Sequence, residues 1–255
     1  MGKIEATRLK VRDIFGKAAR QRTGRTRIEG GRTVASQATG AIVRMVLVMV
    51  LVAMPSMLLG DVTTDTKQMV ALVALFSGLL TLVEYNAAYP SLVEFRDAPP
   101  FNRLRFLMLL ATVTCLSIIA RGHEAPSNLT EITEAIGTLI GMSMDFPYSP
   151  VRLATQMMAD GTSATQIANV RTAAGMAYLI SLISLGIFVV LLKVGRWPNR
   201  HASFNVWINL PTFDPTAGPD VVVRLTRDAR INIAFGFLLP FLTPAAVKMA
   251  SSGFA

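Results

Sequence analysis

The stretch AAGMAYLISLISLGIFVVLL, residues 173–192, decides the fold of this chain. It contains no charged residue, and Lys193, Arg196 and Trp197 close it on the C-terminal side. At a rise of about 1.5 Å per residue, about 20 apolar residues in a helix cross a hydrocarbon core about 30 Å thick. The stretch therefore predicts a transmembrane helix, and the chain is expected to be a membrane protein.

Four further apolar runs have the same character. They cover residues 41–60, 68–83, 106–120 and 231–247. Only helices and closed barrels satisfy every backbone group in lipid, and these runs lack the alternation of barrel strands. Charged residues make up 16% of the chain, whereas a soluble domain carries about 25%. The sequence thus predicts an all-α integral membrane protein with about five transmembrane helices and additional amphipathic helices at the membrane interface.

The segments between the runs give the expected organisation. Residues 1–40 form a basic cytoplasmic tail, and residues 41–120 hold the first three transmembrane helices with a cytoplasmic loop at 85–105. Residues 121–172 form external interfacial helices. Residues 173–255 hold the last two transmembrane helices, separated by a cytoplasmic loop at 193–230.

Residues 128–144 predict an amphipathic helix. Asn128 begins a segment with capping-box spacing, and apolar residues follow at helical intervals from Leu129 to Ile140. About 16 residues with charges at the front suit a helix that lies on the far interface better than one that crosses it. Whether it dips into the membrane stays open.

The distribution of Lys and Arg predicts the orientation. With five crossings, 20 of the 25 Lys and Arg residues fall on the side of the N-terminus and five on the other side. Positive residues collect in cytoplasmic loops, so the N-terminus is expected in the cytoplasm and the C-terminus outside. A sixth crossing at 129–144 would place Lys193–Arg230 outside, and we reject it on that ground.

Groups that usually carry chemistry are missing from the predicted membrane-spanning segments. No ionisable residue lies near the centre of a span, and both histidines, His123 and His201, lie outside the spans. The single cysteine, Cys115, cannot form an internal disulfide and is expected to act as a small packed hydrophobe. No catalytic, cofactor-binding or metal-binding residue is therefore expected, and the chain is not expected to be an enzyme.

The loops and one helix face offer candidate contact residues instead. Aromatic and Arg side chains beside a membrane act either as interface anchors or as a docking surface, and both alternatives stay open here. The candidate partner-binding residues are Tyr89, Phe95, Arg96, Phe101, Arg103, Trp197, Trp207 and Phe213. Ala177, Ser181 and Gly186 form a small-residue stripe for helix packing, within this bundle or against another protein's helix.

These features favour a non-catalytic membrane subunit or assembly factor of a larger complex. Its expected partners are other membrane protein subunits, with anionic phospholipids bound by the basic tail, and its expected location is a bacterial inner membrane. The net charge of +9 is explained by the cytoplasmic segments, so no nucleic acid partner is expected. The alternative is a facilitative channel or transporter for a small solute, lined by Asn232, Thr243 and the Ser and Thr side chains of the third and fourth spans, with the Pro240–Pro244 bend as its gate. A third hypothesis, a lipid-processing enzyme, would use the polar cluster of Glu84, Glu94, Arg96 and Asp97.

Overall fold

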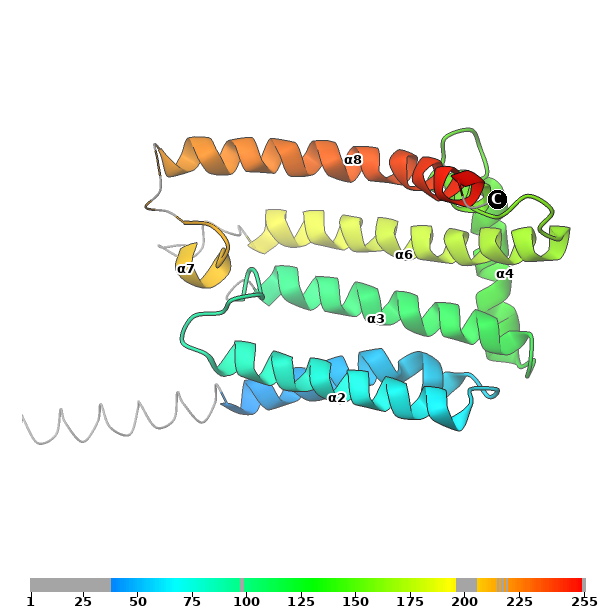
Figure 1. Ribbon diagram of the computed structural model, residues 1–255, viewed down its shortest axis with the longest axis horizontal. Helices are drawn as coiled ribbons and strands as arrows, with labels where there is room; N and C mark the ends of the chain where they lie inside the picture. Colours follow the sequence, from blue (N-terminus) through cyan, green and yellow to red (C-terminus); the bar gives the residue numbers. More distant parts are fainter. Residues whose placement is uncertain are drawn as a thin grey trace, which may run out of the picture.

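The computed structural model is all-helical over the residues it describes, which are 38–96, 99–195, 206–214, 216, 218 and 220–253 (Figure 1). Five helices in this part of the chain are long and apolar enough to cross a membrane. They are Ala38–Leu58, α2 (Thr64–Asn86), α3 (Pro99–Gly122), α6 (Ala164–Gly195) and α8 (Val221–Gly253). The prediction of an all-α chain with five apolar spans is confirmed. The tail at 1–37, Asp97 and Trp197 lie outside the described residues.

The five long helices lie side by side and alternate in direction (Figure 1). One end of the bundle holds the starts of α3 and α8, the end of α6 and the short helix α7 (Val206–Asn209). We call it the basic end, because its elements carry Arg44, Arg96, Arg103, Arg105, Lys193 and Arg224. The opposite end holds α4 (Asn128–Ser143) and α5 (Pro150–Gln156).

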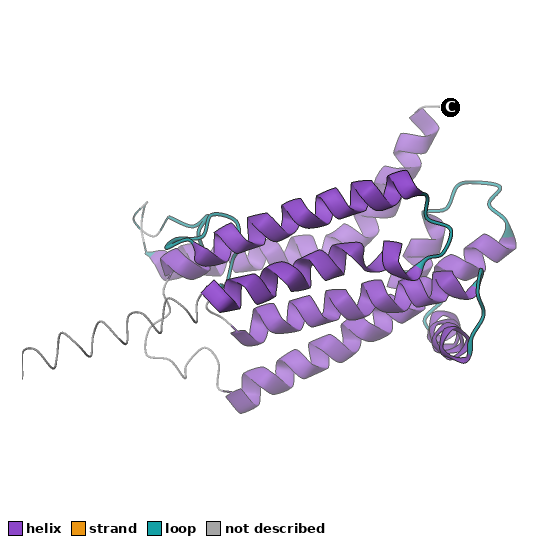
Figure 2. Cartoon of the chain, turned by 90° about the horizontal axis from the view of Figure 1, so that it is seen from below, coloured by secondary structure: helices purple, strands orange, loops and turns teal. Residues whose placement is uncertain are grey.

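The helix expected at 128–144 is present as α4, and it runs across the bundle rather than along it. Figure 1 shows it crosswise to α3 and α6, and Figure 2 shows it nearly end-on beside the long helices. Its cap is Ser127 rather than Asn128: the Ser127 hydroxyl accepts the Thr130 N–H, and the Thr130 hydroxyl accepts the Ser127 N–H at 2.8 Å. The capping box therefore begins one residue earlier than the sequence spacing indicates.

The face that α4 buries is its small and polar one. Its buried residues are Thr130, Thr133, Gly137 and Gly141. The large apolar side chains lie on the exposed face, where Leu129 and Leu139 are 61% and 66% exposed. In a soluble protein this arrangement would be inverted, because burial of large apolar groups drives packing in water.

Three long helices begin well before the apolar runs indicate, and one of them is α6, which begins at Ala164 rather than near residue 173. Helix α3 begins at Pro99, so Phe101, Arg103 and Arg105 lie on its first two turns rather than in a loop. Proline is tolerated there because the first helical residues have no intrahelical partner for their N–H groups. Helix α8 begins at Val221, which places Arg224 on the helix, while Pro240 and Pro244 lie inside it. Figure 1 shows the red, C-terminal part of α8 turned away from the direction of the rest.

The first two helices contact each other at a glycine. A Cβ atom on Gly78 of α2 would lie 2.5 Å from Met49 Cγ, so the Met49 side chain fills the space that the glycine leaves. Ala74, one turn earlier on α2, is also buried. Flexible methionine side chains suit such irregular gaps.

Candidate functional site

The loop that follows α2 at the basic end is folded around the carboxylate of Glu84. Its Oε2 atom accepts the backbone N–H groups of Ser91, Leu92 and Val93 at 2.9, 3.0 and 3.2 Å, and its Oε1 atom accepts the Ser91 hydroxyl at 2.9 Å. Glu84 is only 5% exposed. An ionised carboxylate is a strong acceptor for several donors at once. Glu84 therefore fixes the shape of the loop and is not free for chemistry.

Arg96 closes the same loop from the other side. Its guanidinium donates to the backbone carbonyls of Glu84, Ala87 and Ala88 at 3.1, 2.6 and 3.2 Å. Carbonyls at the end of a helix lack intrahelical donors, and a cation there is also favoured by the helix dipole. The sequence predicts Arg96 as a partner-binding residue, but in the structure its guanidinium donates hydrogen bonds to carbonyls of its own chain.

Phe95 connects this loop to helices α7 and α3. Its N–H donates to the Asn209 carbonyl of α7 at 2.7 Å, and its own carbonyl accepts from the Asn102 side chain on α3. Its ring lies 4.8 Å from that of Phe101, which in turn lies 5.9 Å from the ring of Phe188 on α6. Phe95 holds a φ of +53°, a conformation that is uncommon for a residue other than glycine. The hydrogen bonds with Asn209 of α7 and Asn102 of α3 hold the backbone in that conformation.

The remaining candidates divide into paired and exposed residues. The Arg224 guanidinium lies over the Phe213 ring, and its Cζ atom is 4.5 Å from the ring centroid. Tyr89 and Trp207 are 70% and 52% exposed, and Arg103 is exposed as well. Tyr89, Arg103 and Trp207 are thus the predicted residues whose side chains are open to the surroundings.

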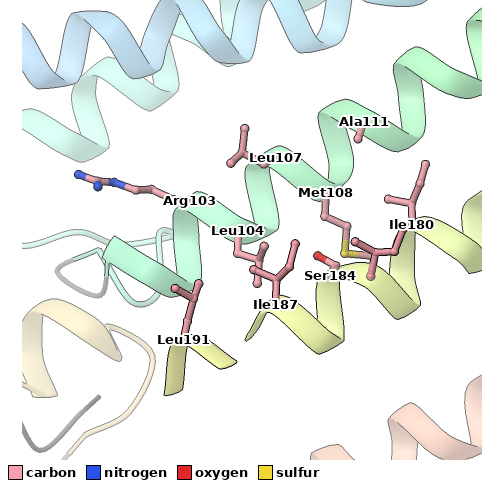
Figure 3. Close-up of a pocket in the computed structure, with 10 residues that line it drawn as sticks. Arg103, Leu104, Leu107, Met108, Ala111, Ile180, Ser184, Ile187 and Leu191 are labelled. Atoms are coloured by element: carbon pink, nitrogen blue, oxygen red, sulfur yellow. The ribbon is translucent and has the colours of Figure 1, made fainter. Parts of the chain in front are cut away.

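Two pockets meet at Arg103. A groove of about 490 Å³ runs between α3 and α6, and Figure 3 shows its apolar side chains together with Arg103 at the start of α3. Its lining includes Leu104, Leu107, Met108, Ile180, Ile187 and Leu191. A second pocket, of about 160 Å³, lies on the side of α3 that faces the first helix and α2, and its lining includes Arg44, Tyr85, Arg96, Asn102, Arg103 and Phe106.

The closest helix packing does not involve the predicted small-residue stripe of Ala177, Ser181 and Gly186. The Ser181 hydroxyl donates to the Ala177 carbonyl at 2.8 Å, and Gly186 has nothing within 4 Å of the place where a Cβ atom would be. The close approach is instead between Gly137 and Gly141 of α4 and Gly175 of α6. The sequence GTLIG at 137–141 is a GxxxG motif, a known signal of close helix contact that could have identified this site.

Of the residues in the alternative hypotheses, Glu84 is buried, whereas several others lie on the surface. Glu94 accepts the Thr212 hydroxyl at 3.3 Å, while Asn232 and Thr243 are exposed on α8. No group of three or more His, Cys, Asp and Glu side chains that could hold a metal ion occurs among the described residues. Comparison with known proteins gave no match to a protein family, a curated protein or a solved structure.

Proposed function

We propose that this chain is a non-catalytic integral membrane subunit or assembly factor that docks on other membrane protein subunits through α8. The observation that carries the proposal is the exposure of α8. Most described side chains of this helix are exposed, although Pro244 is buried, and the helix packs mainly on the short helix α5. Transmembrane helices associate by close packing, because lipid tails are as apolar as the side chains themselves. A long helix that makes so few contacts within its own chain leaves its exposed side chains available for contact with another protein.

The middle of α8 has the surface expected of such a contact. Phe235 and Phe237 are 58% and 69% exposed, and the rings of Phe237 and Phe241 lie 5.6 Å apart. Gly236 lies between the first two phenylalanines and has nothing within 4 Å of its would-be Cβ atom. Aromatic side chains around a small residue favour close and specific packing with a neighbouring helix.

The basic end would complete the contact outside the hydrocarbon core. Tyr89 and Trp207 are exposed there on a loop and a helix that the contacts of Glu84 and Phe95 hold in place. By the positive-inside rule we expect this end and the N-terminus in the cytoplasm and the C-terminus outside, and the location we propose is a bacterial inner membrane. The basic tail would then add contacts with anionic phospholipids.

Two glycine variants test the docking proposal. Gly236→Trp adds a large side chain in the middle of α8, and Gly186→Trp adds the same side chain on α6; both positions are open within the chain. The full chain is purified from its native membrane in mild detergent, and its assemblies are weighed by native mass spectrometry. We expect a hetero-complex with wild type and Gly186→Trp, and its loss with Gly236→Trp. A monomer or homo-oligomer with wild type, or a complex that keeps Gly236→Trp, would contradict the proposal.

A further inference from the structure

Arg103 lines two pockets, of which one is mainly apolar and the other contains three arginines. It lies near the start of α3, at one end of the 490 Å³ apolar groove between α3 and α6 (Figure 3). It also lines the 160 Å³ pocket that Arg44 and Arg96 share. We propose that Arg103 binds the phosphate of an anionic glycerophospholipid, with one acyl chain in the α3–α6 groove. This inference does not depend on the docking role of α8.

The charges around Arg103 favour an anion. Arg44 stacks on the Tyr85 ring at 4.6 Å and donates to the Gly40 carbonyl, and Arg96 donates to backbone carbonyls, so neither positive charge is neutralised by these partners. No described residue accepts a hydrogen bond from Arg103, and no carboxylate side chain is among the lining residues of either pocket. Arg binds phosphate oxygens with two parallel hydrogen bonds, and basic pockets between transmembrane helices bind lipid headgroups.

The groove explains why the anion should carry an acyl chain. From Arg103 to Ala111 it follows α3 for about 12 Å of helix axis, away from the basic end and toward the middle of the span. Its lining is apolar beyond Arg103 except for Ser184. A phosphate bound at the end of a spanning helix lies at headgroup depth, and its acyl chain would continue along the groove in the direction of the hydrocarbon core.

The size of the groove favours a lipid chain over a partner helix. Its volume of about 490 Å³ is within the range of small-molecule sites, about 300–1,000 Å³. A partner helix is about 10 Å across with its side chains and would fill more than this volume over the same length of groove. The three leucines and three isoleucines that line the groove offer dispersion contacts to a flexible chain.

Arg105 provides a matched control on the same helix. It lies two residues after Arg103, stacks on the Phe101 ring at 5.2 Å and lines a different pocket on the other face of α3 and α6. Arg105→Gln removes the same charge at nearly the same depth without touching the proposed site. A second variant, Ala111→Phe, fills the apolar groove and leaves every arginine in place.

The test measures binding of phosphatidylglycerol to the full chain by native mass spectrometry, with phosphatidylcholine as the zwitterionic comparison. We expect one tightly held phosphatidylglycerol in wild type and Arg105→Gln, about tenfold weaker binding in Arg103→Gln, and weaker binding in Ala111→Phe. Equal losses in Arg103→Gln and Arg105→Gln would reduce the effect to net charge and overturn the proposal. So would phosphatidylcholine binding as tightly, or inorganic phosphate displacing the lipid completely, which would assign the site to free phosphate.

Discussion

Gly175 of α6 lies directly against Gly141 of α4. A Cβ atom on Gly175 would lie 2.6 Å from the Gly141 Cα atom and 2.5 Å from the Gly137 carbonyl oxygen. The contact is therefore backbone to backbone, where the crosswise helix meets the longest apolar span. Nearby, the hydroxyls of Thr138 and Thr172 hydrogen-bond across the same pair of helices at 2.9 Å. This crossing sets the position of α4 at the end of the bundle opposite the basic end.

Substitution of Gly175 by Leu is expected to destabilise the chain strongly. The new side chain would meet backbone atoms of α4, which cannot move aside without separating the two helices, and overpacking typically costs about 1–3 kcal/mol or more. Thermal unfolding in detergent can be followed with a thiol-reactive dye that detects exposure of Cys115, the single cysteine. Gly186→Leu on the same helix is the control, because it adds the side chain in open space. Equal losses of stability would contradict the crossing as described.

Asp145 is expected to matter more for stability than other acidic residues at the same end. One of its carboxylate oxygens pairs with Arg152 of α5, and the other lies 2.9 Å from the Arg171 Nε atom of α6. Asp145→Asn keeps the shape but leaves two arginines without their counter-ion. Because Arg152 is 42% exposed and water screens that pair, we expect a loss of about 1–3 kcal/mol. The measurement is the same unfolding assay, with exposed Asp160→Asn as the control.

The count of spans could be predicted from the sequence, whereas the packing could not. Apolar length alone identifies a crossing, so all five spans were predictable. Hydrophobicity does not predict which face of a helix packs on protein, because lipid covers large apolar side chains as well as protein does. Leu129 and Leu139 therefore gave no sign that α4 buries the opposite face, and only the GxxxG spacing of Gly137 and Gly141 carried that information.

The basic end shows a second limit of sequence patterns. Glu84 and Arg96 bind backbone N–H and carbonyl groups of a loop, and such partners leave no side-chain pattern to detect. In the sequence alone, the charged side chains of Glu84 and Arg96 are equally consistent with a polar cluster on the surface. The early start of α3 was missed because its first turns carry Pro99 and arginines that lie beyond the apolar run.

Removal of the Glu84 carboxylate is expected to loosen residues 91–93. Glu84→Ala leaves three backbone N–H groups without their acceptor, at about 1–3 kcal/mol for each one that stays out of water. Glu84→Gln keeps one carbonyl oxygen at the position of Oε2, so it should have a smaller effect. Hydrogen exchange of the Ser91, Leu92 and Val93 amides measures this directly. Glu94→Ala, which removes an exposed acid from the same loop, should leave their exchange unchanged, and a similar increase there would refute the role of Glu84.

The difference in charge between the two ends of the bundle predicts how the chain is oriented in the membrane. We expect the basic end in the cytoplasm, because 20 of the 25 Lys and Arg residues belong to that side and positive loops resist translocation. In a Cys115→Ser background, single cysteines are placed at Asp65 and Asp160 of the opposite end and at Tyr89 and Thr216 of the basic end. All four positions are exposed. A membrane-impermeant maleimide added to intact spheroplasts should label the first two, and the other two only after permeabilisation. The reverse pattern would place the N-terminus outside, and labelling of all four in intact cells would mean that the chain inserts in both directions.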